Sequence, residues 1–308
     1  MPCRNEGTMY MSGIGGGMPK LAVEMTDPVS QTLLIPLWAR AVEQREPEPL
    51  VRDPVASMMV DQIDYDWRRV RLGRGDLVQC VVRLREFDRF VRDFLRRHPA
   101  GTVVHLGCGL DARFQRVDNG QVRWFDLDLP QVIALRRRLL PESDRDRYLA
   151  GSAFETGWMA QLDHDESDHV LFVAEAILLY FDEVQVKDLI LALQSRFPGA
   201  ELVCDVCTPL AVRIDNVHLL FARAAARIHW AVRDPSDVES WSPGIRLVES
   251  FSYFDDPEPR MGLPSWLVRF PSLSRATSIQ RYILGTAPRT SVREEDRSRG
   301  VRPGDDIG

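Results

Sequence analysis

Three features are scarce or absent in this sequence of 308 residues, and each absence excludes a class of protein. No stretch of about 18 consecutive apolar residues occurs, so no membrane-spanning helix is predicted. Positive charge is not in excess: the formal net charge is −6, whereas a protein that coats nucleic-acid phosphates needs a basic face. Only five cysteines occur, and their odd, scattered set indicates free thiols in a reducing compartment. Since the N-terminus also has no apolar signal segment, we expect a cytoplasmic protein.

The two ends of the chain differ in composition from its middle. Residues 1–20 are rich in Gly and Met, and residues 288–308 are charged and nearly free of large apolar groups. Such segments bury too little apolar surface to offset the entropy of ordering, so both are predicted to be disordered. The chain is 44% hydrophobic and 27% charged, and the residues between the ends hold ample apolar material for a core.

Helical patterns occupy the first part of this middle region. Thr26-Asp27-Pro28 combines a capping residue with a first-turn proline, and Asp53-Pro54 repeats the signal for a helix near 54–64. Residues 75–97 carry apolar side chains at helical spacing, on one face. We therefore expect an N-terminal helical cap over residues 21–98.

From Thr102 onward, short apolar runs alternate with helical stretches. This alternation predicts a mostly parallel sheet covered by helices on both faces. Two later runs lack a crossover helix between them, so the last strand is expected to be antiparallel. The result is a seven-stranded α/β, Rossmann-like core over 99–287, with a lid insertion at about 207–262. The predicted strands are 102–106, 122–125, 147–150, 170–174, 201–206, 245–249 and 279–284, and the predicted helices are 110–119, 130–140, 156–162, 183–195 and 209–233.

A glycine-rich turn follows the first strand of this core. Ligands in such sheets bind at the carboxyl ends of the strands, and Gly107 and Gly109 would allow a sharp turn and a close approach to the backbone. The same residues, with Ala112, also satisfy the dinucleotide-binding fingerprint. The turn alone therefore fits an adenosyl cofactor, a dinucleotide or no ligand.

Acids at the ends of two strands separate these possibilities. Asp128 lies 21 residues after Gly107, where a carboxylate can bind the ribose of either cofactor or cap the helix that begins near Pro130. Glu175 follows a run of apolar residues, and a buried, unpaired glutamate would be costly. A sulfonium cofactor with an amino acid tail would satisfy Glu175 with its ammonium, which a nicotinamide dinucleotide lacks there. The pair therefore favours S-adenosylmethionine (SAM).

Five segments resemble one known family. LGCGLDARFQRV, WFDLDLP, VAEAILLYF, TLLIPLWARA and RDPVA are similar to segments of the leucine carboxyl methyltransferase family, in particular its bacterial branch of tetracenomycin-type polyketide O-methyltransferases. The resemblance covers about residues 26–286. It implies a class I SAM-dependent methyltransferase fold with an N-terminal helical cap.

The resemblance also implies roles for seven residues. The family's cofactor-carboxylate arginine matches Arg83, although the same helix is rich in arginine and a solvated side chain is the alternative. The family's adenine segment lacks its acid here, and Ser152 stands in that segment. The predicted cofactor-binding residues are Arg83, Gly107, Gly109, Asp128, Ser152, Glu175 and Tyr180.

No metal site is predicted. Cys204 and Cys207 form a lone Cys-x-x-Cys with no second pair, and the His-rich segment 164–169 is interpreted as a solvated loop.

The acceptor of the methyl group decides whether a catalytic base is needed. A carboxylate is already ionised at neutral pH, whereas a phenol with a pKa near 10 needs a base. Candidate bases in the insertion are Asp215, His218 and His229, the two histidines being about three turns apart on one face of a predicted helix. The sequence thus predicts a SAM-dependent O-methyltransferase acting on a carboxylate or acidic hydroxyl of a small, polyketide-like molecule, with no nucleic-acid or membrane partner. An NAD-dependent dehydrogenase and a non-catalytic SAM-binding domain are the alternatives.

Overall fold

The computed structural model describes residues 20–22, 30–70, 72–162, 169–214, 226–262, 266, 269–270 and 274–285. The predicted disordered ends lie outside these residues, apart from Lys20. So do Asp215, His218 and most of the His-rich segment 164–169.

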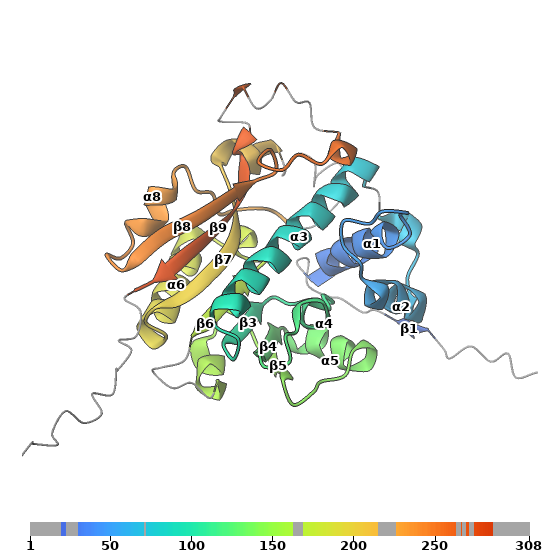
Figure 1. Ribbon diagram of the computed structural model, residues 1–308, viewed down its shortest axis with the longest axis horizontal. Coiled ribbons are helices and arrows are strands. Elements are labelled where there is room, and N and C mark those ends of the chain that lie inside the picture. The colour runs from blue at the N-terminus through green and yellow to red at the C-terminus, as the bar shows by residue number, and fades with distance from the viewer. Residues whose placement is uncertain are drawn as a thin grey trace, which may run out of the picture.

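The N-terminal part is helical. It comprises the 3-10 turn η1 (Ser30–Leu33), α1 (Leu34–Glu43), α2 (Pro54–Gln62), the turn η2 (Trp67–Arg69) and α3 (Arg74–Arg97), with two short parallel strands, β1 (Leu21–Ala22) and β2 (Ile63–Asp64). The capping signal before α2 is confirmed, because Asp53 Oδ1 accepts a hydrogen bond from the Ala56 amide at 2.9 Å. The long helix α3 crosses the sheet, and α1 and α2 lie beyond it (Figure 1).

The rest of the described chain forms one seven-stranded sheet in the order β5-β4-β3-β6-β7-β9-β8. All neighbouring pairs are parallel except those of β9, which runs antiparallel to β7 and β8, as predicted. The strands are β3 (Thr102–Leu106), β4 (Arg123–Asp128), β5 (Asp146–Ala150), β6 (Val170–Ala174), β7 (Ala200–Cys207), β8 (Ile245–Ser252) and β9 (Thr277–Leu284). The helical elements between them are α4 (Arg113–Val117), α5 (Pro130–Leu139), η3 (Thr156–Gln161), η4 (Leu178–Tyr180), α6 (Glu183–Arg196), α8 (Pro235–Glu239) and η5 (Pro259–Met261).

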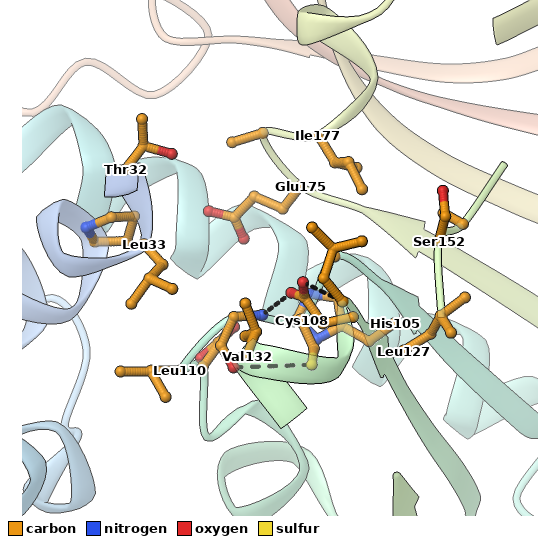
Figure 2. A pocket seen from close by; sticks show the side chains of 18 of the residues that line it. Thr32, Leu33, His105, Cys108, Leu110, Leu127, Val132, Ser152, Glu175 and Ile177 are labelled. Atoms are coloured by element: carbon orange, nitrogen blue, oxygen red, sulfur yellow. Dashed lines mark hydrogen bonds between the residues drawn. The ribbon is translucent and has the colours of Figure 1, made fainter. Parts of the chain in front are cut away.

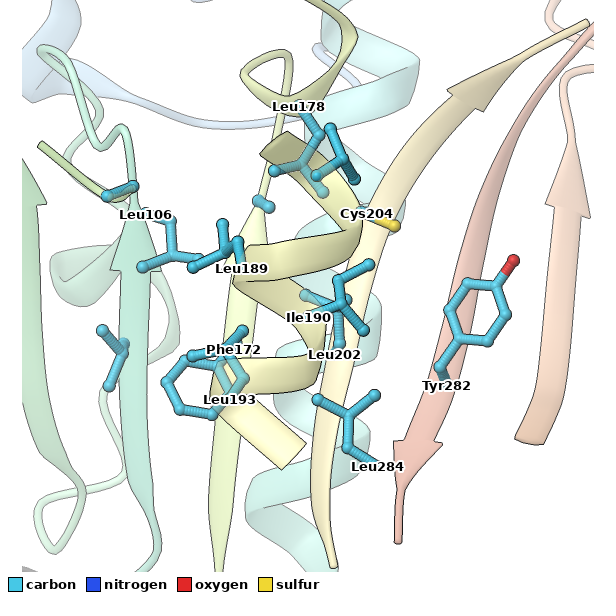
Figure 3. Close-up of a cluster of buried hydrophobic side chains, with 14 of the residues drawn as sticks. Leu106, Phe172, Leu178, Leu189, Ile190, Leu193, Leu202, Cys204, Tyr282 and Leu284 are labelled. Atoms are coloured by element: carbon cyan, nitrogen blue, oxygen red, sulfur yellow. The ribbon is translucent and has the colours of Figure 1, made fainter. Parts of the chain in front are cut away.

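Apolar side chains cover both faces of this sheet. On one face, α6 packs Leu189, Ile190 and Leu193 against Phe172 of β6 and strand β7 (Figure 3). On the other face, α3 contributes a fully buried row that includes Phe87, Phe90 and Phe94. Central strands that are buried on both sides explain why their sequences are continuous apolar runs.

The predicted helix over 209–233 is wrong at residues 226–233. Residues 209–214 are helical, but 226–232 form an irregular, extended segment. The burial there alternates: Ala226, Ile228, Trp230 and Val232 are buried, whereas the residues between them are more exposed. This period of two is that of an extended chain lying on a surface, not of a helix. In the part of the chain that is described, no helix combines the length and apolarity needed to cross a membrane.

Candidate cofactor site

A cavity of about 390 Å³ opens at the carboxyl ends of β3, β4 and β6 (Figure 2). The position follows from topology, because the chain leaves β3 for β4 on one side and reaches β6 on the other. Parallel sheets bind ligands at such a switch point. Thr32 and Leu33 of the N-terminal part close the cavity opposite the sheet. Six of the seven predicted cofactor residues line it, namely Arg83, Gly107, Gly109, Asp128, Ser152 and Glu175.

The glycine turn after β3 requires glycine for two reasons. Gly107 and Gly109 have φ values of +66° and +53°, in the left-handed region that residues with a Cβ rarely adopt. A Cβ on Gly107 would also lie 2.6 Å from Cδ1 of Ile177, a contact far closer than atoms tolerate. Because Gly107 has no side chain, its backbone and Ile177 pack against each other and both line the cavity.

Asp128 fixes the second glycine. Its Oδ2 accepts a hydrogen bond from the Gly109 amide at 2.7 Å, and its Oδ1 accepts one from the Leu129 amide at 2.7 Å. The N-cap position of helix α5 is Leu129, and no side chain caps this helix. Asp128 lies one residue before that position, so its alternative role as the helix cap is wrong. Burial raises the pKa of Asp128, while its hydrogen bonds to Gly109 and Leu129 oppose that rise.

Glu175 is paired with two arginines of the chain itself. Its Oε1 accepts from Arg83 Nε at 2.9 Å, and its Oε2 accepts from Nη2 of Arg113. Although burial favours the neutral form, Arg113 and Arg83 hold the pKa of Glu175 below its ordinary value. The carboxylate is therefore already ion-paired by the chain itself, and its contact with a ligand ammonium stays a prediction. The solvated alternative for Arg83 is wrong, because its side chain is only 17% exposed.

Sequence reasoning missed Arg113 and also two further residues that shape this corner, Ala176 and Asp205. Ala176 has a φ of +53°, unusual for a residue with a Cβ, and its amide donates to Asp205 Oδ1 at 2.9 Å. Asp205 on β7 also lies 3.9 Å from Arg83 Nη1, and burial raises its pKa to about 6. In the sequence, Asp205 stands between Cys204 and Cys207 and carries no motif that marks it as a site residue. The sequence carries no signal for the conformation of Ala176.

The remaining predicted site residues lie in different places. Ser152 Oγ accepts from the Phe154 amide at 3.2 Å, and the Phe154 and Phe181 rings meet with centroids 3.9 Å apart at the cavity. Tyr180 is not among the described residues that line the cavity; a hydrogen bond joins its side chain to Thr32, and burial raises its pKa.

His229 differs from its prediction. It lies on no helix, its ring is exposed, and its amide donates to the Leu179 carbonyl at 2.8 Å. Cys204 and Cys207 are buried and are not joined by a disulfide. Within the described residues, no cluster of His, Cys, Asp or Glu could hold a metal ion.

The sheet order and the glycine turn at its switch point define a class I SAM-dependent methyltransferase. The chain belongs to the leucine carboxyl methyltransferase family, whose model matches residues 34–194.

Two relatives show how far the similarity extends. The chain is 34% identical over 230 residues to the tetracenomycin polyketide synthesis O-methyltransferase TcmP of Streptomyces glaucescens, a match that covers 74% of this chain and 84% of that protein. It is 26% identical over 276 residues to the SAM-dependent methyltransferase dpfgK of Gibberella zeae, covering 83% and 92%.

Among solved structures, a duf574 family protein from Streptomyces avermitilis superposes with a TM-score of 0.53 at 14% identity, covering 81% of this chain and 97% of that one. At that identity the likeness concerns the fold alone.

Proposed function

We propose that the cavity binds SAM through the predicted residues, and that the protein transfers the methyl group to a carboxylate or acidic hydroxyl of a small organic molecule. The observation that carries the proposal is the cavity at the switch point, with the glycine turn and Asp128 on one side and Arg83 with Glu175 on another. Neither the dehydrogenase nor the non-catalytic alternative has support from the family.

The chemistry of the lining suits each part of SAM. The carboxylate of Asp128 would accept from the ribose hydroxyls, and the guanidinium of Arg83 would bind the methionine carboxylate. Leu129, Val132 and Phe154 give the cavity an apolar wall for the adenine ring, beside Ser152. Glu175, held between two arginines, lies where it can accept from the ammonium while keeping Arg83 oriented.

Calorimetry tests this assignment. We expect the wild-type protein to bind SAM and not NAD, and Glu175→Gln to weaken SAM binding by about 1.5–3 kcal/mol, the scale of a hydrogen bond to a charged group. Glu183→Gln, at the exposed first turn of α6, is the matched control and should leave the affinity unchanged. Binding of NAD in place of SAM would contradict the proposal.

The groups around the cavity support an acceptor that is already ionised. Bound SAM supplies an electrophilic methyl group, and the chain's part is to align the acceptor with it and exclude water. Among the described lining residues, Asp111 and Glu175 are ion-paired with arginines, and burial raises the pKa of Cys108. Asp128 accepts from two backbone amides, and His105 is only 2% exposed, with its Nε2 3.4 Å from Arg113 Nη1 and its Nδ1 3.5 Å from Asp126 Oδ1. None of these is a free base for a phenol. The relative TcmP, itself named an O-methyltransferase, makes a small polyketide-like molecule our proposed acceptor.

The pH profile of methyl transfer distinguishes the two acceptor types. A carboxylate acceptor should give a turnover rate that is flat from about pH 6 to 9, because it is ionised throughout. His229→Ala should then keep turnover within about tenfold, since loss of a general base costs about 10²–10⁴-fold. A rate that rises steeply with pH and collapses in His229→Ala would instead identify a phenolic acceptor with a histidine base.

A further inference from the structure

One arginine that contacts the glycine turn is buried, although the two arginines that follow it in sequence are exposed. Arg136 on α5 is 0% exposed, whereas Arg137 and Arg138, the next two residues, are exposed. Its Nη1 donates to the Asp111 carbonyl at 2.7 Å and to the Gly109 carbonyl at 3.2 Å. Arg136, which is not among the described residues that line the cavity, therefore contacts the glycine turn at two points.

A second group orients this guanidinium. Nη2 of Arg136 donates to Asp126 Oδ2, and Asp126 Oδ1 accepts from Trp124 Nε1 at 2.8 Å. The ring of Tyr148 lies 4.8 Å from the guanidinium carbon. Burying such a cation is costly unless its donors are used. Nη1 and Nη2 are used, whereas Nε has no hydrogen-bond partner among the described residues. A planar guanidinium can bind a carboxylate through one nitrogen and two carbonyls through the other.

We propose that Arg136, oriented by Asp126, is a positioning residue that holds the glycine turn in the shape that binds SAM. The inference rests on the proposed function. The turn contains two glycines, which have access to many backbone conformations, yet its Gly109 amide must meet Asp128. Fixing the carbonyls of Gly109 and Asp111 prevents the turn from sampling other shapes. Cofactor binding then avoids the entropic cost of ordering it.

The test compares two lysine substitutions on one helix. Arg136→Lys keeps the charge beside Asp126, but a single ammonium cannot also reach both carbonyls. Arg137→Lys is the matched control, since Arg137 is 47% exposed in its side chain and pairs with Glu142 instead of the turn. Hydrogen exchange of the turn amides is measured without ligand, SAM affinity by calorimetry, and kcat and KM by methyl transfer.

We expect Arg136→Lys to remain folded, to exchange the amides of residues 107–111 at least tenfold faster, and to bind SAM at least tenfold more weakly. At saturating SAM its kcat should stay within about twofold of wild type, because the methyl acceptor is untouched. Arg137→Lys should match wild type in all three measurements.

Unchanged exchange and affinity in a folded Arg136→Lys protein would overturn the inference. If Arg136→Lys does not fold, the double variant Asp126→Asn/Arg136→Met removes both buried charges together, and it must show the same faster exchange. If neither variant folds, Arg136 is purely structural and the inference is also overturned. Failure of the wild-type protein to bind SAM would refute the proposed function. The exchange measurement would still test whether Arg136 holds the glycine turn in place.

Discussion

At the scale of single residues, the glycine turn yields a prediction that separates backbone strain from a steric clash. Gly107→Ala would place a residue with a Cβ at a φ of +66° and 2.6 Å from Ile177 Cδ1. Gly120→Ala would impose similar strain at a φ of +81°, but its Cβ would meet nothing within 4 Å. Left-handed backbone costs a residue with a Cβ about 1–2 kcal/mol.

We therefore expect both variants to lose about 1–2 kcal/mol of unfolding free energy from backbone strain, and Gly107→Ala to lose more. Only Gly107→Ala should also weaken SAM binding, by tenfold or more. Denaturant titration and calorimetry measure the two effects. Equal SAM affinities for Gly107→Ala and Gly120→Ala would show that the turn tolerates a displaced Ile177.

Residue-scale predictions from sequence succeeded where a local signal existed. The glycines and Asp128 could be placed because they follow strands at fixed distances. The partners of Glu175 could not, since Arg83 and Arg113 are 92 and 62 residues away along the chain and meet it through the fold. Arg136 did carry a signal: its spacing from the buried Val132 and Leu139 puts it on the inner face of α5.

At the scale of elements, the spacing of the buried residues decides whether a segment is a helix or an extended chain. The α3 helix was predictable because its apolar residues recur at helical spacing over 24 residues. The helix expected over 209–233 is wrong at 226–232, because the buried positions there recur every second residue. Polar side chains between them, such as Arg227 and His229, are the local sign of an extended segment.

At the scale of the whole molecule, alternation of strands and helices predicted the class of fold, and the missing crossover predicted an antiparallel last strand. The alternation could not predict which buried charged residues come into contact in the folded sheet. Asp146 at the start of β5 is an example. It is 1% exposed, and in the described part of the chain neither of its carboxyl oxygens has a hydrogen-bond donor.

We expect Asp146 to make the stability of the whole molecule depend on pH. Burial and the neighbouring Asp126 carboxylate raise its pKa to about 8, although Arg136 opposes the rise. An unfolded aspartate has a pKa of about 3.9, so between about pH 4 and 8 the folded protein holds a proton that the unfolded chain has released. The free energy of unfolding must therefore fall as pH rises, by up to about 1.4 kcal/mol per pH unit from this group.

Asp146→Asn removes this titration, because the amide is close in shape to the protonated carboxyl and stays neutral at every pH. We expect the variant to match wild type near pH 4 to 5 and to exceed its unfolding free energy increasingly toward pH 8, as measured by denaturant titration across that range. Asp144→Asn, exposed and two residues earlier, is the control and should run parallel to wild type. If the plot of unfolding free energy against pH for Asp146→Asn also runs parallel to that of wild type, Asp146 is ionised in the folded protein. Asp126 and Asp146 would then lie side by side as two charges, with Arg136 as the cation that faces both.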